Sequence, residues 1–420
     1  MDIPSLFMIP SAVSSGKVHS VFPNSTDADF DFARSSTATR VNSNGLIESV
    51  ASGQARLNYE IEGGLVNTKP SLLLEPQRTN TAEYSEDAAV YTYNDSTIRE
   101  NVQIITPYGY KSQAVKIDAE FNEPYPIRAA SFNLGSYSTN DVVTLSGFVK
   151  YNGYRYVQFG GYFGSESSRF DLINGVIIQN QSNVISSSMV KFPNDWYKLT
   201  VTYTFQNTIG NGYLYAGWVL SYNSSFAYTN ARSGGIYVWG LQAELGSYAT
   251  SYIPTNGSSQ TRAAETCNGA GTSSIFESSE GILYAEVQAF SETGSSGVFT
   301  LSGGSNTNRV KIELDGGVVK GRVDVSGSGV GLLNYTVAIT NYLKIALKWK
   351  ASDFELWANG SSRASITSGS SFSANALTEL AFDRGDGGED FYGKIRDIRV
   401  YNTKEMTDSE VDILLTKITS

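Results

Sequence analysis

The sequence has very little cysteine or histidine: Cys267 and His19 are the only residues of their kinds among 420. One cysteine excludes an intramolecular disulfide, so burial and strand pairing must stabilise the fold. We expect Cys267 to be an ordinary loop thiol, with an interchain disulfide as the alternative. A metal site of the Cys/His type is excluded too, because it needs more than one of each residue.

Catalytic motifs are also missing. A histidine-based triad has His19 as its only candidate, in a polar stretch, and no serine stands in a Gly-x-Ser-x-Gly motif. The Glu-x-Asp-x-x-Glu signature of laminarinase-type hydrolases is absent. The nearest carboxylate pairs, Glu60 with Glu62 and Asp353 with Glu355, alternate with apolar residues as on the solvated face of a strand. We therefore predict that the protein is not an enzyme, and cleavage of a polysaccharide is the third hypothesis.

Long apolar runs and positive charge are lacking as well. No stretch approaches the roughly 20 apolar residues of a membrane span, and residues 1–4 have no basic n-region and no apolar h-region, so we expect no secretion signal. The formal net charge is −10 and the pI is near 4.8. Binding to nucleic acid needs a basic surface that releases counterions from phosphates. We therefore expect neither a nucleic-acid partner nor membrane insertion.

The residues that are present favour β-structure. The chain has 40 glycines and 26 tyrosines together with much Ser, Thr and Asn, and segments with a 3.6-residue apolar period are scarce. This composition is typical of short strands joined by tight turns. We predict an all-β protein with two antiparallel β-sandwich, jelly-roll domains in tandem after an extended N-terminal attachment segment, and one short C-terminal helix.

Residues 83–255 show the strand pattern of the first sandwich. We predict a hairpin with its turn at Asn152-Gly153, a second turn at Asn174-Gly175, and a strand over residues 196–205. The closing strand begins at residue 236, where alternation places one set of side chains on one face, and Pro254 forbids its continuation as a central strand. The side chains of that face are Tyr237, Trp239, Leu241, Ala243 and Leu245.

Residues 275–420 predict the second sandwich. Apolar residues alternate with charged ones over residues 309–314 before an Asp-Gly-Gly turn, and again over residues 343–349. Near the end, Thr407 and Glu410 form a capping-box pattern ahead of an apolar stripe at helical spacing, which predicts the C-terminal helix.

The rest of the chain has few strand signals. Residues 1–82 are too poor in apolar residues to form a large core alone, so we interpret them as a segment that docks on the next domain, on sister chains or on a larger assembly. A flexible leader is the alternative. Residues 256–274 are rich in Gly, Ser, Thr and Asn, which predicts a linker that is open to proteases.

Four segments carry family resemblances. The segment IYVWGLQAELGSYATSYIPT (residues 236–255) resembles the terminal strand of a carbohydrate-binding-like jelly roll that recurs in proteins of tailed bacteriophages. The segments FARSSTATRVNSNGLIESV (32–50) and PSLLLEPQRTN (70–80) resemble the N-terminal cassette that precedes this jelly roll. FELWANG (354–360), followed by the strand and helix near the C-terminus, resembles the laminin-G and concanavalin-A-like lectin sandwich.

These resemblances imply a bacteriophage virion protein, such as a head or tail fibre, displayed on the particle surface after assembly in the host cytoplasm. They imply attachment to host surface glycans, contact with other virion proteins through the N-terminal segment, and a homo-oligomer, a trimer or alternatively a dimer. A purely structural decoration or linker protein is the alternative function.

Alternation in residues 154–163 and 213–220 suggests where glycans bind. If the aliphatic faces of these strands form the core, the tyrosines line the opposite face, where aromatic planes can stack on sugar rings. Burial of these tyrosines against a neighbouring chain or against the N-terminal cassette is an equally good interpretation. The predicted glycan-binding residues are Tyr154, Tyr156, Gln158, Tyr162, Tyr213 and Tyr215.

No cofactor is expected. The acidic loop of residues 383–390 offers carboxylates that suit Ca²⁺, but it lacks the spacing of an EF-hand, so an ordinary turn is the preferred interpretation.

Overall fold

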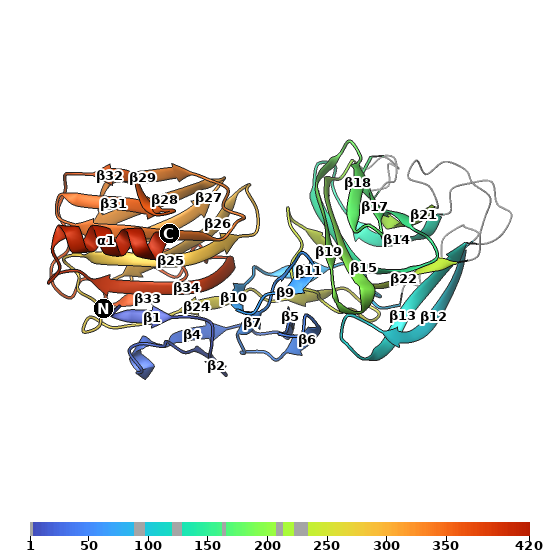
Figure 1. Ribbon diagram of the computed structural model, residues 1–420, viewed down its shortest axis with the longest axis horizontal. Helices are drawn as coiled ribbons and strands as arrows, with labels where there is room; N and C mark the ends of the chain where they lie inside the picture. Colours follow the sequence, from blue (N-terminus) through green and yellow to red (C-terminus); the bar gives the residue numbers. More distant parts are fainter. Residues whose placement is uncertain (1–2, 88–96, 120–127, 162–164, 207–212, 222–233) are drawn as a thin grey trace.

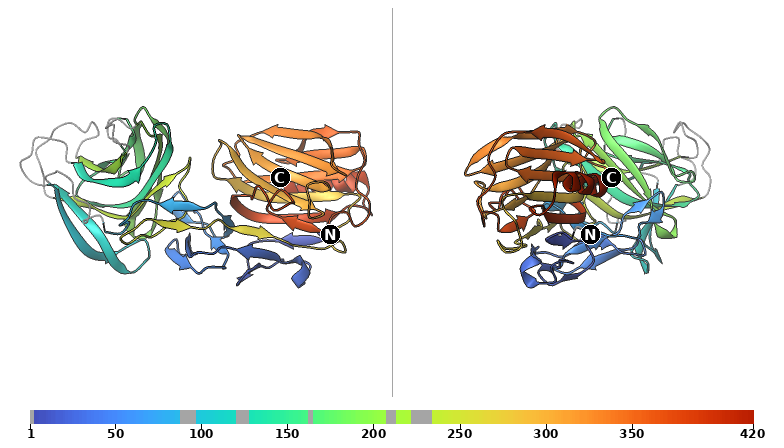
Figure 2. Two further views of the ribbon diagram at one scale, coloured as in Figure 1. Left: turned by 180° about the vertical axis from the view of Figure 1, so that it is seen from behind. Right: turned by 60° about the vertical axis from the view of Figure 1, so that its left-hand side comes forward.

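The computed structural model describes residues 3–87, 97–119, 128–161, 165–206, 213–221 and 234–420. Two β-sandwiches lie side by side, and the strands of the N-terminal segment run beneath both of them (Figure 1). Two further views show the same arrangement (Figure 2). The predicted all-β class with sandwich domains and one short C-terminal helix is confirmed. None of the helices in the described part is long and apolar enough to cross a membrane.

The first sandwich consists of a six-stranded and a five-stranded antiparallel sheet. The six-stranded sheet has the order β12 (Thr97–Ile105), β13 (Lys111–Ala119), β22 (Gly235–Leu245), β15 (Val142–Asn152), β20 (Trp196–Thr204), β19 (Val184–Lys191). The five-stranded sheet has the order β14 (Arg128–Ser136), β21 (Tyr213–Ser221), β16 (Tyr156–Gly160), β17 (Ser167–Asp171), β18 (Val176–Asn180). A core of aliphatic and aromatic side chains fills the space between the sheets.

Two turn predictions in this sandwich have opposite outcomes. Asn174-Gly175 joins β17 to β18 in a hairpin, as predicted, and Gly175 has a φ of 66°. Asn152-Gly153 does not form a hairpin, because β15 and β16 belong to different sheets. Gly153 instead packs against the backbone of Gly234, so close that a Cβ atom would lie 2.8 Å from its Cα.

The predicted alternation of the closing strand fails in the middle of β22. A register shift separates its pairing with β15 at Ser146 from that at Phe148, and Gly240 sits there with a φ of 65°. Such a bulge shifts the side chains beyond it to the other face. Leu241 and Ala243 therefore join the sandwich core, whereas Trp239 joins a second apolar cluster on the outer side of the sheet.

The second sandwich shares its larger sheet with the N-terminal segment. Its own strands there are β32 (Ser361–Ile366), β31 (Asp353–Ala358), β30 (Leu343–Lys350), β25 (Gly281–Ala289) and β34 (Gly393–Asn402). Beyond β34 the sheet continues with β10 (Ser71–Leu74) and β7 (Arg56–Asn58), and β1 (Leu6–Met8) also pairs with β34. The facing sheet has the order β29 (Ser328–Thr336), β28 (Val318–Val325), β27 (Arg309–Asp315), β26 (Ser295–Ser302), β33 (Glu379–Ala381).

The C-terminal helix α1 (Asp408–Thr419) begins at the predicted capping box, in which Thr407 and Glu410 bond reciprocally. Its buried stripe packs on the outer face of the larger sheet. The stripe consists of Val411, Leu414, Leu415 and Ile418, as predicted.

The N-terminal segment forms short strands along its whole described length, so it is no flexible leader. It contains the hairpins β5 (Ala38–Val41) with β6 (Ile47–Val50) and β8 (Ile61–Glu62) with β9 (Leu65–Val66). A small sheet has the order β2 (Val13–Ser14), β3 (Lys17–Val18), β4 (Phe30–Ala33), β24 (Thr266–Asn268). The segment thus pairs with strands that come from far along the chain.

Residues 256–274 are not the open linker that their composition predicted. Within them β23 (Gln260–Arg262) pairs with β11 (Arg78–Asn80), and β24 pairs with β4. Cys267 lies in β24, is fully buried, and belongs to the core of the second sandwich, so it is neither a loop thiol nor placed for an interchain disulfide. Gly and Ser mark turns here, while the intervening residues complete sheets begun by the N-terminal segment.

Candidate functional site

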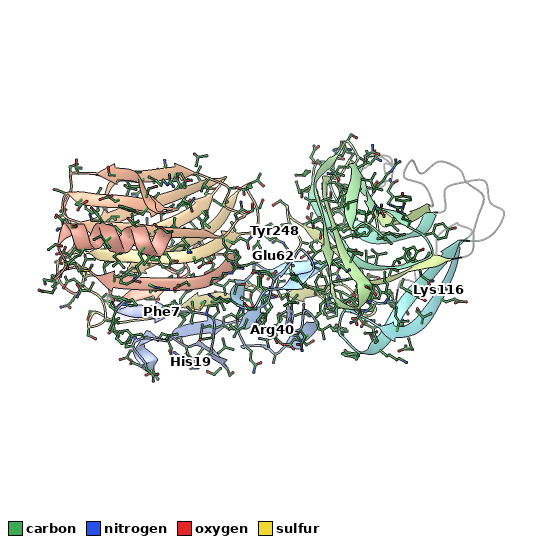
Figure 3. The ribbon with its side chains drawn as sticks, in the orientation of Figure 1. Phe7, His19, Arg40, Glu62, Lys116 and Tyr248 are labelled. Carbon is green, nitrogen blue, oxygen red and sulfur yellow. The ribbon has the colours of Figure 1, made fainter. Side chains whose placement is uncertain are left out.

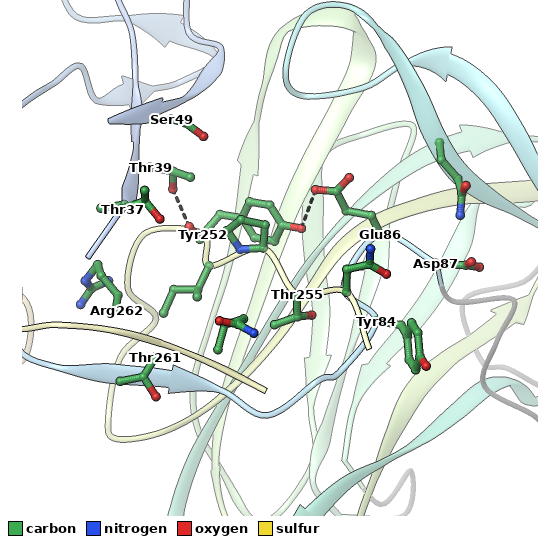
Figure 4. A pocket seen from close by; sticks show the side chains of 16 residues that line it. Thr37, Thr39, Ser49, Tyr84, Glu86, Asp87, Tyr252, Thr255, Thr261 and Arg262 are labelled. Atoms are coloured by element: carbon green, nitrogen blue, oxygen red, sulfur yellow. Dashed lines mark hydrogen bonds between the residues drawn. The ribbon is translucent and has the colours of Figure 1, made fainter. Parts of the chain in front are cut away.

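A pocket of about 530 Å³ lies where the N-terminal segment meets the first sandwich; we call it the junction pocket (Figure 4). The hairpin β5–β6 forms one wall, the residues after β11 and those before β23 form the others, and Gln113 of β13 completes it. Its lining is mostly hydroxyl, amide and carboxyl groups: Thr37, Ala38, Thr39, Ser49, Tyr84, Glu86, Asp87, Gln113, Tyr252, Ile253, Pro254, Thr255, Asn256, Gln260, Thr261 and Arg262.

Asn80 fixes two walls of this pocket to each other. Its side-chain amide donates to the carbonyls of Leu241 and Ile253, and its Oδ1 accepts from the backbone N–H groups of Ala82 and Ala243. The side chain is fully buried. Because all four bonds go to backbone, Asn80 determines where the chain runs on both sides of the closing strand.

Behind the pocket lies a buried charge network of five residues: Arg34, Arg56, Glu75, Arg262 and Glu265. Glu265 pairs with Arg34 at 2.6 Å and also with Arg56, while Glu75 pairs with Arg56 at 2.8 Å and with Arg262 at 2.9 Å. Every side chain is at most 3% exposed. Burial alone would raise the pKa of Glu75, but the charges of Arg262 and Arg56 lower it to about 2.

Two buried polar atoms of pocket-lining residues have no hydrogen-bond partner. One is the Nε of Arg262, which can only donate, and the other is the Oδ1 of Asp87, which accepts when the carboxyl group is ionised. Figure 4 shows Arg262 and Asp87 at opposite ends of the pocket, so these two atoms are separate features of its lining.

Glu86 carries the second carboxyl group of the pocket. The hydroxyl of Tyr252 donates to it at 3.0 Å and that of Tyr108 at 3.2 Å. Burial raises the pKa of Glu86, and these hydrogen bonds oppose the rise. Figure 4 shows the Glu86–Tyr252 bond at the inner wall. The two tyrosines thus hold the carboxyl group in one orientation.

Two of the predicted glycan-binding residues, Tyr154 and Gln158, are buried. Tyr154 is 2% exposed and belongs to the core between the sheets. It precedes β16, which begins at Tyr156, so strand alternation does not set the direction of its side chain. Gln158 is 4% exposed and its amide donates to Ser167 Oγ at 2.6 Å.

Of the other predicted glycan-binding residues, Tyr156 is the one whose side chain the structure describes. Tyr156 is half-buried, and the Arg155 guanidinium lies 5.0 Å from the centre of its ring. Tyr162 lies outside the described residues. Tyr213 and Tyr215 belong to β21, and their side chains lie outside the described part. These three stay predictions.

Sequence reasoning missed the junction pocket because its lining comes from three distant parts of the chain. No short motif contains Tyr84, Glu86 and Tyr252 together. The resemblance of residues 32–50 and 70–80 to one cassette could have indicated this region. Those two blocks contribute Arg34 and Glu75 to the buried charge network, and Asn80 to the hydrogen bonds that hold the chain beside the pocket.

The carboxylate pairs weighed from the sequence are engaged in ion pairs. Glu60 binds Arg396 at 2.8 Å, and Lys348 binds Asp353 at 2.7 Å and Glu355 at 3.2 Å. In the acidic loop, Arg384 pairs with both Asp386 and Glu389. Within the described ranges no three His, Cys, Asp or Glu side chains are grouped to hold a metal. Calcium binding stays an untested hypothesis.

A scan against protein families finds no match, and a search of curated proteins finds none either. Among solved structures, the Ruminococcus gnavus IT-sialidase CBM40 bound to α2,3-sialyllactose is 17% identical, with 36% of this chain and 92% of that chain covered and a TM-score of 0.29. Domains LG4-5 of the mouse laminin α1 chain are 12% identical, covering 68% and 93%, with a TM-score of 0.24. The Bacteroides ovatus Xyloglucan PUL GH43B is 10% identical, covering 95% and 99%, with a TM-score of 0.21. All three TM-scores are below 0.5, so these likenesses establish no function.

Proposed function

We propose that the protein binds glycans without cleaving them, and that the junction pocket is the binding site. The observation that carries the proposal is the lining of the pocket, which is mostly hydroxyl, amide and carboxyl groups. A sugar hydroxyl both donates and accepts, so the hydroxyl, amide and carboxyl groups of this lining can bond to the hydroxyls of a glycan. Tyr84 adds aromatic surface to the lining, which suits the apolar face of a sugar.

The charge of the pocket favours neutral sugars. Glu86 and Asp87 contribute carboxyl groups, and Arg262, the pocket's cation, already pairs with Glu75. A carboxylate on the sugar would meet like charge without a free cation to compensate it. We therefore expect neutral glycans to bind more tightly than sialylated or uronic-acid glycans.

We also propose that this glycan binding takes place on the surface of a bacteriophage particle. This part of the proposal rests on the sequence resemblance of residues 32–50, 70–80 and 236–255 alone. On that basis the protein is a virion surface component that attaches to host glycans. A structural linker remains the second candidate, supported by the way in which the N-terminal segment joins both sandwiches.

A glycan array with the full chain tests the proposal. Tyr84→Ala and Asp87→Ala should each weaken binding about three- to tenfold, because each removes a pocket contact. The matched controls are Tyr151→Ala and Asp27→Ala, which remove exposed side chains that do not line the pocket. The controls should bind as the wild type does.

The outcomes separate the candidate functions. If no glycan binds, the structural candidate replaces this one. If binding persists in Tyr84→Ala and Asp87→Ala, the site lies elsewhere, and the predicted tyrosines of β21 become the next targets. Release of reducing ends during incubation would show cleavage and overturn the non-catalytic part of the proposal.

A further inference from the structure

His19 takes part in a hydrogen-bonded chain of three side chains in the small sheet of the N-terminal segment. Its Nε2 lies 2.9 Å from Ser14 Oγ, and its Nδ1 lies 2.8 Å from Asp29 Oδ2. With Nδ1–H donated to Asp29, the Nε2 lone pair accepts the Ser14 hydroxyl proton. This is the connectivity of a Ser-His-Asp triad: nucleophile, base, and the carboxylate that orients the base.

The local fold explains how these residues meet. Ser14 pairs with Lys17 across the turn of Ser15 and Gly16, and β3 then pairs with β4, which brings the residues that flank these strands together. Val18 and Phe30 are fully buried in the core of the second sandwich, whereas Ser14 is exposed. Figure 3 shows His19 at the outer side of the N-terminal segment.

Burial increases from Ser14, which is exposed, through His19 to Asp29, as in a catalytic triad. Asp29 is 8% exposed, and its second oxygen, Oδ1, accepts the backbone N–H of Ser20 at 2.8 Å. Its carboxylate therefore has a fixed orientation. The His19 side chain is 38% exposed. A substrate can thus reach the serine and the imidazole while the carboxylate stays behind them.

We propose that Ser14, His19 and Asp29 form a second site, which hydrolyses small acyl esters. Ser14 Oγ attacks the ester carbonyl carbon while His19 Nε2 takes its proton. The C–O bond of the ester breaks, and His19 returns that proton to the departing alcohol oxygen. Water then attacks the acyl-serine with His19 again as base, which releases the carboxylic acid and restores Ser14. The sum is ester plus water giving acid plus alcohol, with no redox change.

The setting limits the class of substrate. The site lies on a face of a small sheet where Ser14 is exposed, and none of these three residues lines the junction pocket or three other pockets of the described part. An acyl group with a long chain would find no apolar cavity here. A short group such as acetyl, carried by an alcohol or by a hydroxyl of a polymer, fits an open face. This site is independent of glycan binding in the junction pocket.

The test uses the full chain with 4-nitrophenyl acetate and a fluorophosphonate probe. We expect hydrolysis above the buffer rate and probe attachment to Ser14, located by mass spectrometry of peptides. Ser14→Ala should abolish both, and His19→Gln should lower hydrolysis about 100-fold or more, as removal of a general base does. Ser15→Ala is the matched control, since it removes the adjacent exposed hydroxyl; it should behave as the wild type does.

Asp29→Asn tests the positioning residue. It should lower kcat with little change in KM, because the imidazole is held in the wrong tautomer. A thermal unfolding scan of each variant separates this effect from loss of folding; Ser14 is exposed, so Ser14→Ala should melt as the wild type does. An unlabelled wild type, or equal hydrolysis by Ser14→Ala, would overturn the proposal.

Discussion

Single buried residues connect the parts of this molecule. Arg56 comes from the N-terminal segment and contacts Glu75, which follows β10, as well as Glu265, which precedes β24. Removing charges from water is costly unless each has a partner of opposite sign. The buried charge network therefore requires all three segments to be in place at once.

Glu75→Gln should destabilise the protein at pH 7 by about 3–5 kcal/mol, because it leaves Arg262 and Arg56 short of a partner.

The wild type should also lose stability as the pH falls. The pKa of Glu75 is about 2 in the folded protein and about 4.3 in an unfolded chain, so its contribution is complete above that higher value and is lost as pH approaches 2.

Urea unfolding at several pH values measures both effects. Glu75→Gln should show a flatter dependence of unfolding free energy on pH between about 4.3 and 2 than the wild type. Glu83→Gln, an exposed carboxylate in the same part of the chain, is the control. An equal pH dependence in both variants would contradict this account of Glu75.

At the scale of elements, the bulge in β22 decides which side chains enter the core of the first sandwich. Gly240→Ala should destabilise the protein by about 1–3 kcal/mol. The positive φ of 65° is unfavourable for alanine, and a Cβ atom would lie 3.0 Å from the Phe148 ring.

Gly63→Ala is the control for the bulge, since Gly63 has a φ of 57° with no atom within 4 Å of an added Cβ. Thermal unfolding of both variants separates the backbone cost, which they share, from the packing cost at Phe148. Equal losses would mean that the contact with Phe148 contributes nothing.

The edge strand β18 has features that favour self-association. All five of its residues are exposed, and its outer edge has no partner strand among the described residues. Ile173 and Ile185, which flank it, are also exposed, at 55% and 54%. Exposed apolar edges without charges pair readily with other strands. A homo-oligomer stays a proposal, and we expect this edge to form its interface.

Ile177→Lys should weaken self-association, because it places a charge on the apolar edge, and light scattering across a concentration series measures the change. Ile413→Lys, on the exposed side of α1, is the control and should leave the molecular mass unchanged. A monomeric wild type at micromolar concentration would contradict the predicted oligomer. An oligomer unaffected by Ile177→Lys would place the interface elsewhere.

At the scale of the whole molecule, the junction between the sandwiches should be closed to reagents. Cys267 is fully buried, and burial raises the pKa of its thiol. We expect thiol reagents to modify it only after unfolding, and proteases to spare residues 260–270. Modification kinetics with and without urea, followed by peptide mapping, check this. Fast modification of the folded protein would restore the open linker that composition suggested.

Much of the fold could be predicted from the sequence, because local rules produce it. The hairpin at Asn174-Gly175, the alternation in residues 196–205 and 309–314, and the capped helix all depend on neighbours within a few residues. The hairpin at Asn152-Gly153 was wrong, because a turn dipeptide specifies a bend and not the sheet in which the next strand pairs. The burial of Tyr154 has a related reason: it precedes β16, and the alternation of side chains between two faces applies only within a strand.

The sequence by itself determined the β class, the two sandwiches and the C-terminal helix, since periodicity and turn residues act over short distances. Only the tertiary structure decided that residues 1–82 and 256–274 form common sheets, that Cys267 is buried, and that the junction pocket and the Ser14–His19–Asp29 chain exist. Each of these depends on which strands pair across long stretches of chain. Backbone hydrogen bonds are alike for all residues, so pairing over such distances is set by the burial of the assembled core.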